Sequence, residues 1–191
     1  TGNPITEVIY FYQKYIEKSE ILNKLKLQEK NFFVLTMHRQ ENVDNLKVLK
    51  RFIFTFNKIV KKFDKAIVWP IHPRSKKMLK LVNIKLDKRI LLVKPLGFFD
   101  FIKLEKNCLM TLTDSGTVQE ESSILKKPCL IIRDYTERPE TIKAGGAKIV
   151  GHNSKKIIKT IEFYLKNNIN IKAIKDYKKK NVSSFVMKIL N

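Results

Sequence analysis

Residues 108–121 read Cys108-Leu109-Met110-Thr111-Leu112-Thr113-Asp114-Ser115-Gly116-Thr117-Val118-Gln119-Glu120-Glu121. An apolar run passes through a turn of small residues into a segment that carries glutamates. This order is typical of a strand, a phosphate-binding turn and a helix, because free backbone N–H groups at a helix start attract anions. We expect Thr117 and Glu120 to form a capping box that fixes the helix start. A merely well-capped helix is the alternative interpretation, and the pattern is not a dinucleotide fingerprint.

Two histidine turns occur at the same kind of position earlier in the chain. His38-Arg39 follows the apolar run 31–37, and His72-Pro73 follows the run 65–71. An imidazole beside a guanidinium suits a diphosphate, and a neutral histidine can shuttle a proton. A structural role for either histidine remains open. Three polar turns at strand ends nevertheless predict one ligand cleft.

Short, continuously apolar runs alternate with helical periodicity, which predicts an α/β fold with a doubly wound parallel sheet of about six strands. Ligands bind beyond the carboxyl ends of the strands in such sheets. The expected strands are Asn31–Met37, Lys65–Ile71, Arg89–Val93, Cys108–Thr113, Pro128–Ile132 and Ala147–Val150. The expected helices are Pro4–Lys18, Ser19–Lys26, Leu46–Phe63, Ser75–Val82, Phe99–Lys106, Val118–Lys126, Arg138–Lys143, Ser154–Lys166 and helices within Ile171–Leu190.

The composition suits one sizeable globular core of 191 residues. A net charge of +21 raises the question of nucleic acid, but only six of 39 cationic residues are arginine. Base recognition favours arginine, so the lysine excess predicts solvated helix faces and no nucleic-acid partner. No apolar run approaches a membrane span and no metal-ligand spacing occurs. Cys108 and Cys129 lie in apolar runs without a disulfide pattern, which favours the cytoplasm. A start at Thr1 rather than methionine suggests sequence missing upstream.

Two further segments could border the cleft. Arg133-Asp134 and the run from Thr136 to Glu140 follow the fifth expected strand, which places Arg138 at the cleft mouth unless it pairs with a neighbouring glutamate. Leu96 to Phe101 follow the third expected strand, where aromatic side chains could wall a planar base. Two of the three phenylalanines there are expected in the core instead.

Together these segments resemble the non-hydrolysing UDP-N-acetylglucosamine 2-epimerases. The resemblance rests on the blocks Thr1-Gly2-Asn3-Pro4, Thr36-Met37-His38-Arg39-Gln40-Glu41-Asn42, Ile71-His72-Pro73, Pro95-Leu96, Thr113 to Glu121, Arg133-Asp134 and Thr136-Glu137-Arg138-Pro139-Glu140. The Asp-Ser-Gly and Thr-Glu-Arg-Pro-Glu blocks, in this order and spacing, are highly specific.

The resemblance implies one half of a glycosyltransferase-B-type fold, in which two Rossmann-like domains enclose the active site. Residues 1–30 would lead in from a missing N-terminal domain, 31–170 would form the UDP-binding domain, and 171–191 would be a helical tail on this domain or towards the missing one. The implied substrate-binding residues are Ser115, Gly116 and Thr117 for the diphosphate, Glu121 for the ribose, Arg138 for the nucleotide, and Leu96 and Phe101 for uracil. His38 would be the catalytic residue beside the diphosphate, and Arg39 and His72 resemble a regulatory UDP-sugar site of some bacterial members.

The family converts UDP-GlcNAc to UDP-ManNAc by elimination and re-addition of UDP, without a cofactor, and serves cell-surface polysaccharide synthesis. Its carboxylates that move the C2 proton come from the first domain, so this chain alone is expected to bind UDP without catalysis. A homodimer is expected when the protein is complete. Gln40, where many members have arginine, and the run from Tyr177 to Asn181 depart from the family pattern. The alternatives are a glycosyltransferase donor domain and a non-catalytic nucleotide-sugar-binding remnant.

Overall fold

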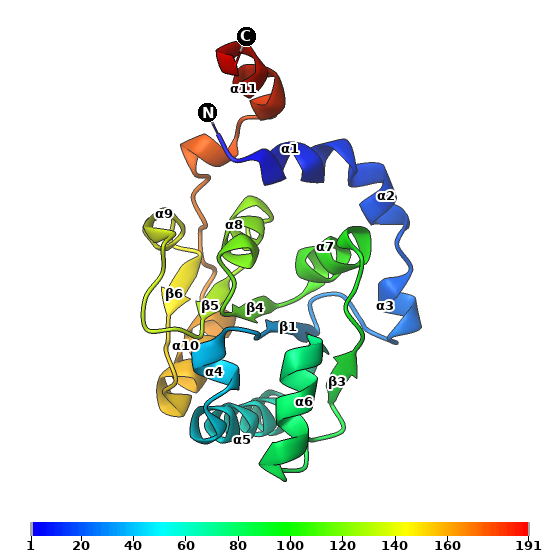
Figure 1. Ribbon diagram of the computed structural model, residues 1–191, viewed down its shortest axis with the longest axis vertical. Coiled ribbons are helices and arrows are strands. Elements are labelled where there is room, and N and C mark those ends of the chain that lie inside the picture. Colours follow the sequence, from blue (N-terminus) through cyan, green and yellow to red (C-terminus); the bar gives the residue numbers. More distant parts are fainter. Residues whose placement is uncertain (1, 191) are drawn as a thin grey trace.

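A computed structural model describes residues 2–190 of the chain. Its centre is a six-stranded, all-parallel sheet in the order β3-β2-β1-β4-β5-β6 (Figure 1). The strands are β1 (Phe32–Thr36), β2 (Ala66–Pro70), β3 (Ile90–Val93), β4 (Met110–Thr113), β5 (Cys129–Ile131) and β6 (Ala147–Ile149). All six expected strands are therefore present, and the doubly wound Rossmann-like sheet is confirmed. The strand order reverses between β1 and β4, the position where such sheets form a ligand crevice.

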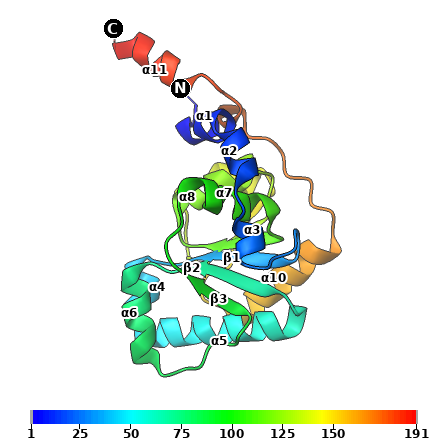
Figure 2. The same ribbon diagram turned by 90° about the vertical axis from the view of Figure 1, so that its right-hand side faces the viewer.

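Helices cover both faces of the sheet (Figures 1 and 2). One face is covered by α4 (Gln40–Val43), α5 (Leu46–Phe63), α6 (Pro73–Val82) and α10 (Ser154–Lys166). The other carries α1 (Pro4–Phe11), α2 (Gln13–Lys18), α3 (Ile21–Lys24), α7 (Phe98–Asn107), α8 (Gly116–Ile124) and α9 (Pro139–Lys143). A 3-10 helix, η1 (Lys175–Tyr177), and α11 (Val182–Leu190) follow, and α11 lies beside α1.

Strand β1 shows why the fold has two cores. Its side chains alternate between the faces of the sheet, as the pleat requires. Phe33 and Leu35 pack into the larger core with α5 and α10, whereas Phe32 and Val34 pack with residues of α3 and α7. A strand that is buried on both sides must be continuously apolar, which explains the run that the sequence displays.

The structure corrects the helix expectations in three places. The expected helix Pro4–Lys18 breaks at Tyr12, whose backbone leaves the helical region while its ring packs 5.3 Å from that of Phe99. The expected helix Ser19–Lys26 shortens to α3. The tail begins extended, because the Lys172 N–H donates to the Ala144 carbonyl at 2.9 Å instead of continuing a helix.

Other expectations hold. Leu46–Phe63 and Ser154–Lys166 form helices with those bounds. The short helix α4 was not expected.

Within residues 2–190, no helix combines the length and apolar character that crossing a membrane requires. Thr1, the first residue of the opening block, lies outside the described residues.

Candidate functional site

A pocket of about 470 Å³ opens at the carboxyl ends of β1, β2 and β4, at the reversal of strand order. Five of the predicted site residues line it: His38, His72, Leu96, Phe101 and Ser115. Four different strand-end connections supply four of these side chains, and helix α7 supplies Phe101. The prediction that separate strand-end turns meet at one cleft is therefore confirmed.

The start of α8 presents backbone N–H groups at this pocket. Ser115 is the N-cap residue in extended conformation (φ −91°, ψ 134°), and the helix begins at Gly116. The first N–H groups of a helix have no partner within the helix, so they are available to an anion. Thr117 is exposed in the first turn.

The expected capping box at this helix start is wrong. The N-cap is Ser115 rather than Thr117, and no side chain caps the helix. Glu120, the expected partner, instead forms an ion pair with Arg138. The helix start is fixed from the strand side, where the Ser115 N–H donates to Thr113 Oγ1 at 2.9 Å.

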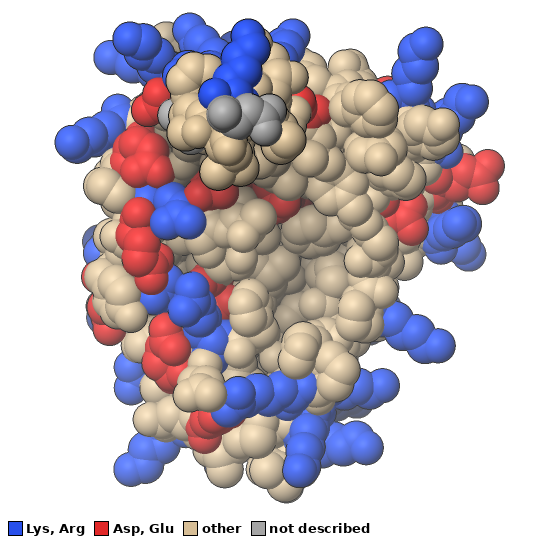
Figure 3. All heavy atoms as spheres, turned by 45° about the horizontal axis from the view of Figure 1, so that its top comes forward, with Lys and Arg blue, Asp and Glu red and all other residues tan. Residues whose placement is uncertain are grey.

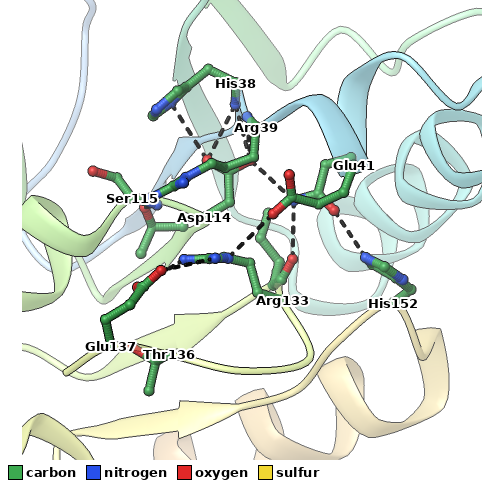
Figure 4. Close-up of polar contacts among 12 residues, drawn as sticks. His38, Arg39, Glu41, Asp114, Ser115, Arg133, Thr136, Glu137 and His152 are labelled. Atoms are coloured by element: carbon green, nitrogen blue, oxygen red, sulfur yellow. Dashed lines mark hydrogen bonds and ion pairs between the residues drawn. The ribbon is translucent and has the colours of Figure 1, made fainter. Parts of the chain in front are cut away.

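Asp114 connects the first histidine turn to the α8 turn (Figure 4). Its carboxylate is fully buried and accepts hydrogen bonds from the backbone N–H groups of His38 and Arg39 at 3.0 and 2.9 Å. His38 Nδ1 lies 3.4 Å from Asp114 Oδ1, while its side chain is 46% exposed. The buried carboxylate thus orients an imidazole that faces the pocket.

The network extends to two residues that the sequence analysis did not assign. Asn42 Nδ2 donates to Asp114 Oδ2 at 3.0 Å and to the Ile132 carbonyl at 3.1 Å. His152 Nε2 lies 2.9 Å from Asn42 Oδ1, at the far end of the chain of contacts (Figure 4). His152 follows β6, so the strand-end pattern that singled out the other two histidines could have found it.

The loop that carries Arg138 is held against α8. Thr136 Oγ1 donates to Gln119 Oε1 at 2.6 Å and accepts from the Arg138 N–H at 3.1 Å. The Arg138 guanidinium pairs with Glu120, as the internal ion-pair alternative stated. It also lies beside Gly116, where an added Cβ would be 3.9 Å from it. Arg138 is therefore next to the α8 turn but is not among the residues that line the pocket.

Ion pairs run along this side of the site. Buried Arg133 lies 3.1 Å from Glu137 and 3.4 Å from Glu41 (Figure 4). Figure 3 shows a central hollow with basic and acidic side chains alternating along one side of it. The rest of the visible surface around the hollow belongs mostly to uncharged residues. Fixed pairs of this kind position the loops without filling the pocket.

Arg39 follows His38 directly, is the half-buried N-cap residue of α4, and is not among the residues that line the pocket. His72 caps α6, since its Nδ1 accepts from the Arg74 N–H at 3.2 Å, and its ring centroid is 6.5 Å from that of His38. His72 thus has a structural role, and its exposed ring also borders the pocket.

The apolar wall of the pocket comes from the β3–α7 connection, which carries Leu96, and from α7 itself, which carries Phe101. Leu96 and Phe101 are half-buried and line the pocket. Phe98 and Phe99 pack instead in a small core with Ile9 and Ile16. Phe101 likewise packs against the core that contains Leu104, so all three phenylalanines are half-buried at the edge of a core and the expected division between two core residues and one pocket residue is not observed.

Glu121 lies one turn into α8 and is 6% exposed. Burial raises the pKa of this carboxyl to about 7. Within residues 2–190, no cluster of three histidine, cysteine, aspartate or glutamate side chains is suited to a metal ion.

Comparison with known proteins identifies the family of the chain. The family model described as UDP-N-acetylglucosamine 2-epimerase matches residues 1–191. The UDP-N-acetylglucosamine 2-epimerase of Methanocaldococcus jannaschii is 43% identical over 90% of this chain and 49% of its own length. The enzyme of that name from Methanococcus maripaludis is 39% identical over 87% of this chain and 48% of its own length.

A solved structure agrees with these relatives. The M. jannaschii UDP-GlcNAc 2-epimerase in complex with UDP-GlcNAc and UDP superposes with a TM-score of 0.85 at 39% identity, over 98% of this chain and 54% of that one. The chain spans about half the length of the relatives it matches. The fold is accordingly that of one half of a glycosyltransferase-B-type protein, as expected. This chain belongs to the UDP-N-acetylglucosamine 2-epimerase family.

Proposed function

We propose that this chain is the UDP-binding half of a UDP-GlcNAc 2-epimerase, which interconverts UDP-GlcNAc and UDP-ManNAc. The observation that carries the proposal is the free start of α8 at the reversal of strand order, facing a pocket that His38 also lines. A diphosphate fits there, because it meets backbone N–H groups and the positive end of the helix dipole. The solved relative named above, which holds UDP-GlcNAc and UDP, supports this ligand.

The other predicted site residues, in and around the pocket, would each contact one part of the nucleotide. Ser115, Gly116 and Thr117 would hold the diphosphate, and Glu121 the ribose hydroxyls. Leu96 and Phe101 form the half-buried apolar wall that suits uracil. Arg138 would leave its ion pair with Glu120 and bind the nucleotide instead. Its position beside Gly116 permits this change of partner.

His38 is the proposed catalytic residue. Elimination of UDP develops negative charge on the departing diphosphate, and a preorganised donor lowers the barrier to that step. Asp114 holds His38 through the backbone and faces its Nδ1, which leaves Nε2 for the ligand. The carboxylates that move the C2 proton would come from the other half of the protein, so this chain alone would bind UDP without turnover.

Three further parts of the proposal concern the whole protein. Arg39 and His72 would form a regulatory nucleotide-sugar site beside His38. The complete protein would be a homodimer. It would supply UDP-ManNAc for the synthesis of cell-surface polysaccharide. It would act in the cytoplasm, where its two buried free thiols stay reduced.

The test is calorimetric titration of the chain with UDP, using Gly116→Ala as the diagnostic variant. An added Cβ at Gly116 meets only Arg138 atoms at 3.9 Å, so the free protein tolerates it. The same methyl group would stand where the diphosphate approaches the backbone. We expect the variant to bind UDP at least about tenfold more weakly, which corresponds to about 1.4 kcal/mol.

Gly97→Ala is the matched control. Gly97 is the N-cap residue of α7, a helix that also follows a strand, and a Cβ there meets nothing within 4 Å. UDP binding that is unchanged in Gly116→Ala would refute the placement of the diphosphate. The double variant Ser115→Ala, Glu121→Ala tests the other assigned contacts. Saturable UDP binding by the wild type that this variant lacks would support them.

A further inference from the structure

Two buried carboxyl groups meet between α7 and α8. Glu105 is fully buried and Glu121 is 6% exposed. Their side chains are in hydrogen-bond contact with each other. In residues 2–190, neither carboxylate forms an ion pair with a lysine, arginine or histidine, and no protein donor reaches either oxygen of Glu105. The sequence analysis assigned no role to Glu105.

This contact requires a proton. Two ionised carboxylates have only acceptor oxygens, so they repel each other instead of bonding. Burial adds a second penalty, because an unpaired charge loses its hydration. Both effects raise the pKa of Glu105 well above its usual range. One shared proton removes the repulsion and leaves a single negative charge on the pair.

Within residues 2–190, the neighbouring side chains supply no free positive charge that would balance the charge of the carboxyl pair. On α8, Glu120 adds negative charge but is itself paired with Arg138. The neighbouring thiols of Cys108 and Cys129 have their pKa raised by burial, to about 12 for Cys129, and so remain neutral.

The nearby lysines are engaged elsewhere. Lys103 and Lys106 of α7 pair with Glu17 of α2. The Lys127 amine donates to the Cys108 carbonyl at 3.2 Å. None of them neutralises the carboxyl pair.

We propose that Glu105 is a positioning residue, which holds Glu121 in place for the nucleotide ribose through one proton shared between the two carboxyl groups. The proposal rests on the role of Glu121 stated above. Glu105 donates the shared proton, so Glu121 remains a carboxylate whose oxygens can accept hydrogen bonds from the ribose hydroxyls. Loss of the proton leaves two buried charges that push Glu121 away from that position.

The shared proton makes the stability of the fold depend on pH. A carboxyl whose folded pKa lies above its unfolded pKa makes the folded protein retain a proton that the unfolded chain releases. Stability is therefore full below about pH 4.5 and falls as pH rises towards the folded pKa, which is about 7 for Glu121 and higher for the pair's last proton. The unfolding equilibrium constant should rise by up to about 100-fold per pH unit between pH 4.5 and pH 7, where the folded pair retains two protons, and by about tenfold per pH unit above pH 7, where it retains one.

The first measurement is unfolding in urea without UDP, from pH 5 to pH 9, for the wild-type chain and Glu105→Gln. Glutamine keeps the shape and can donate its amide hydrogen to Glu121 without titrating. We expect the variant to lose the wild-type pH dependence above pH 7, where only the shared proton is retained, while the titration of buried Glu121 below pH 7 persists. Glu20→Gln, at an exposed glutamate, should retain the full wild-type pH dependence. Equal slopes in wild type and Glu105→Gln would overturn the shared proton.

The second measurement is UDP affinity over the same pH range. Wild-type affinity should fall about tenfold per pH unit once the pair has lost its last proton, and Glu105→Gln should hold its affinity there. Ionisation of the UDP phosphate is common to both proteins and cancels in the comparison. Glu105→Leu, which fills the site but offers Glu121 no donor, should bind more weakly than Glu105→Gln at every pH.

The two measurements separate the two proposals. A proton-linked unfolding slope without any UDP binding would retain the carboxyl pair and refute the proposed function. UDP binding with the same pH profile in wild type and Glu105→Gln would retain the function and refute the positioning role. If Glu105→Gln does not fold, the part of the wild-type unfolding slope between pH 7 and pH 8 decides whether the shared proton is present.

Discussion

Asp114 is the polar residue on which the two halves of the pocket depend. It receives hydrogen bonds from two backbone N–H groups and from Asn42, all within a buried site. In Asp114→Asn, one oxygen becomes an NH₂ group that faces donors, so at least one buried donor loses its partner. We expect the free energy of unfolding to fall by about 2–3 kcal/mol. Urea unfolding measures it.

Asp134→Asn is the matched control for this change. Asp134 is exposed and lies three residues beyond the end of β5, whereas buried Asp114 directly follows β4. Its substitution should change the free energy of unfolding by less than about 0.5 kcal/mol. Equal losses in both variants would show that the Asp114 carboxylate does not organise the turns.

The residues that the sequence analysis missed share one property: their roles depend on partners distant in the chain. Glu105 follows Phe101 and Ile102 at helical spacing, so its place on the buried face of α7 could have been read from the sequence. Its partner Glu121 could not, because the approach of α7 to α8 is set by packing. Arg138 shows the converse, since its ion pair with Glu120 was one of two stated alternatives.

Helix α5 provides a test of how an element gains its stability. Phe56 is fully buried and its ring lies 5.9 Å from that of Trp69, whereas Phe54 on the opposite side of the same helix is 54% exposed. Phe56→Ala should lower the free energy of unfolding by about 3–5 kcal/mol, because it leaves a cavity in the larger core. Phe54→Ala removes the same atoms from the surface and should cost less than about 0.5 kcal/mol.

Chemical denaturation of both variants measures the difference. Comparable losses would mean that α5 is held by helix propensity and not by its buried face. The same buried face explains why the bounds of α5 could be predicted while those of α1 could not. Eight apolar residues at three- and four-residue steps specify α5, but the break at Tyr12 is caused by its contact with a ring on another helix.

The sequence predicts the class of the sheet, but it does not predict the order of the strands. Six apolar runs separated by helical segments predict a parallel sheet, since parallel strands need crossover connections. Nothing local states that β1 pairs with β4, because that register joins residues far apart in the chain, such as Leu35 and Leu112. The site lies at that pairing, so its location followed from the general rule for such sheets.

The whole molecule carries 39 cationic and 18 acidic residues, and this imbalance predicts how its stability responds to salt. Excess like charge destabilises a compact state through self-repulsion. Raising the ionic strength from 0.01 M to 0.15 M shortens the screening length from about 30 Å to about 8 Å. Exposed ion pairs such as Arg74–Asp44 weaken at the same time, but each contributes only about 0–1 kcal/mol.

Because the uncompensated cations outnumber such pairs, screening of the repulsion should prevail. We expect the unfolding temperature to rise with sodium chloride by about 2–4 °C, on the order of 1 kcal/mol. Scanning calorimetry measures it, and potassium chloride should act equally if ionic strength is the cause. A falling unfolding temperature would mean that the ion pairs around the pocket, and not the lysine excess, dominate the electrostatics of the fold.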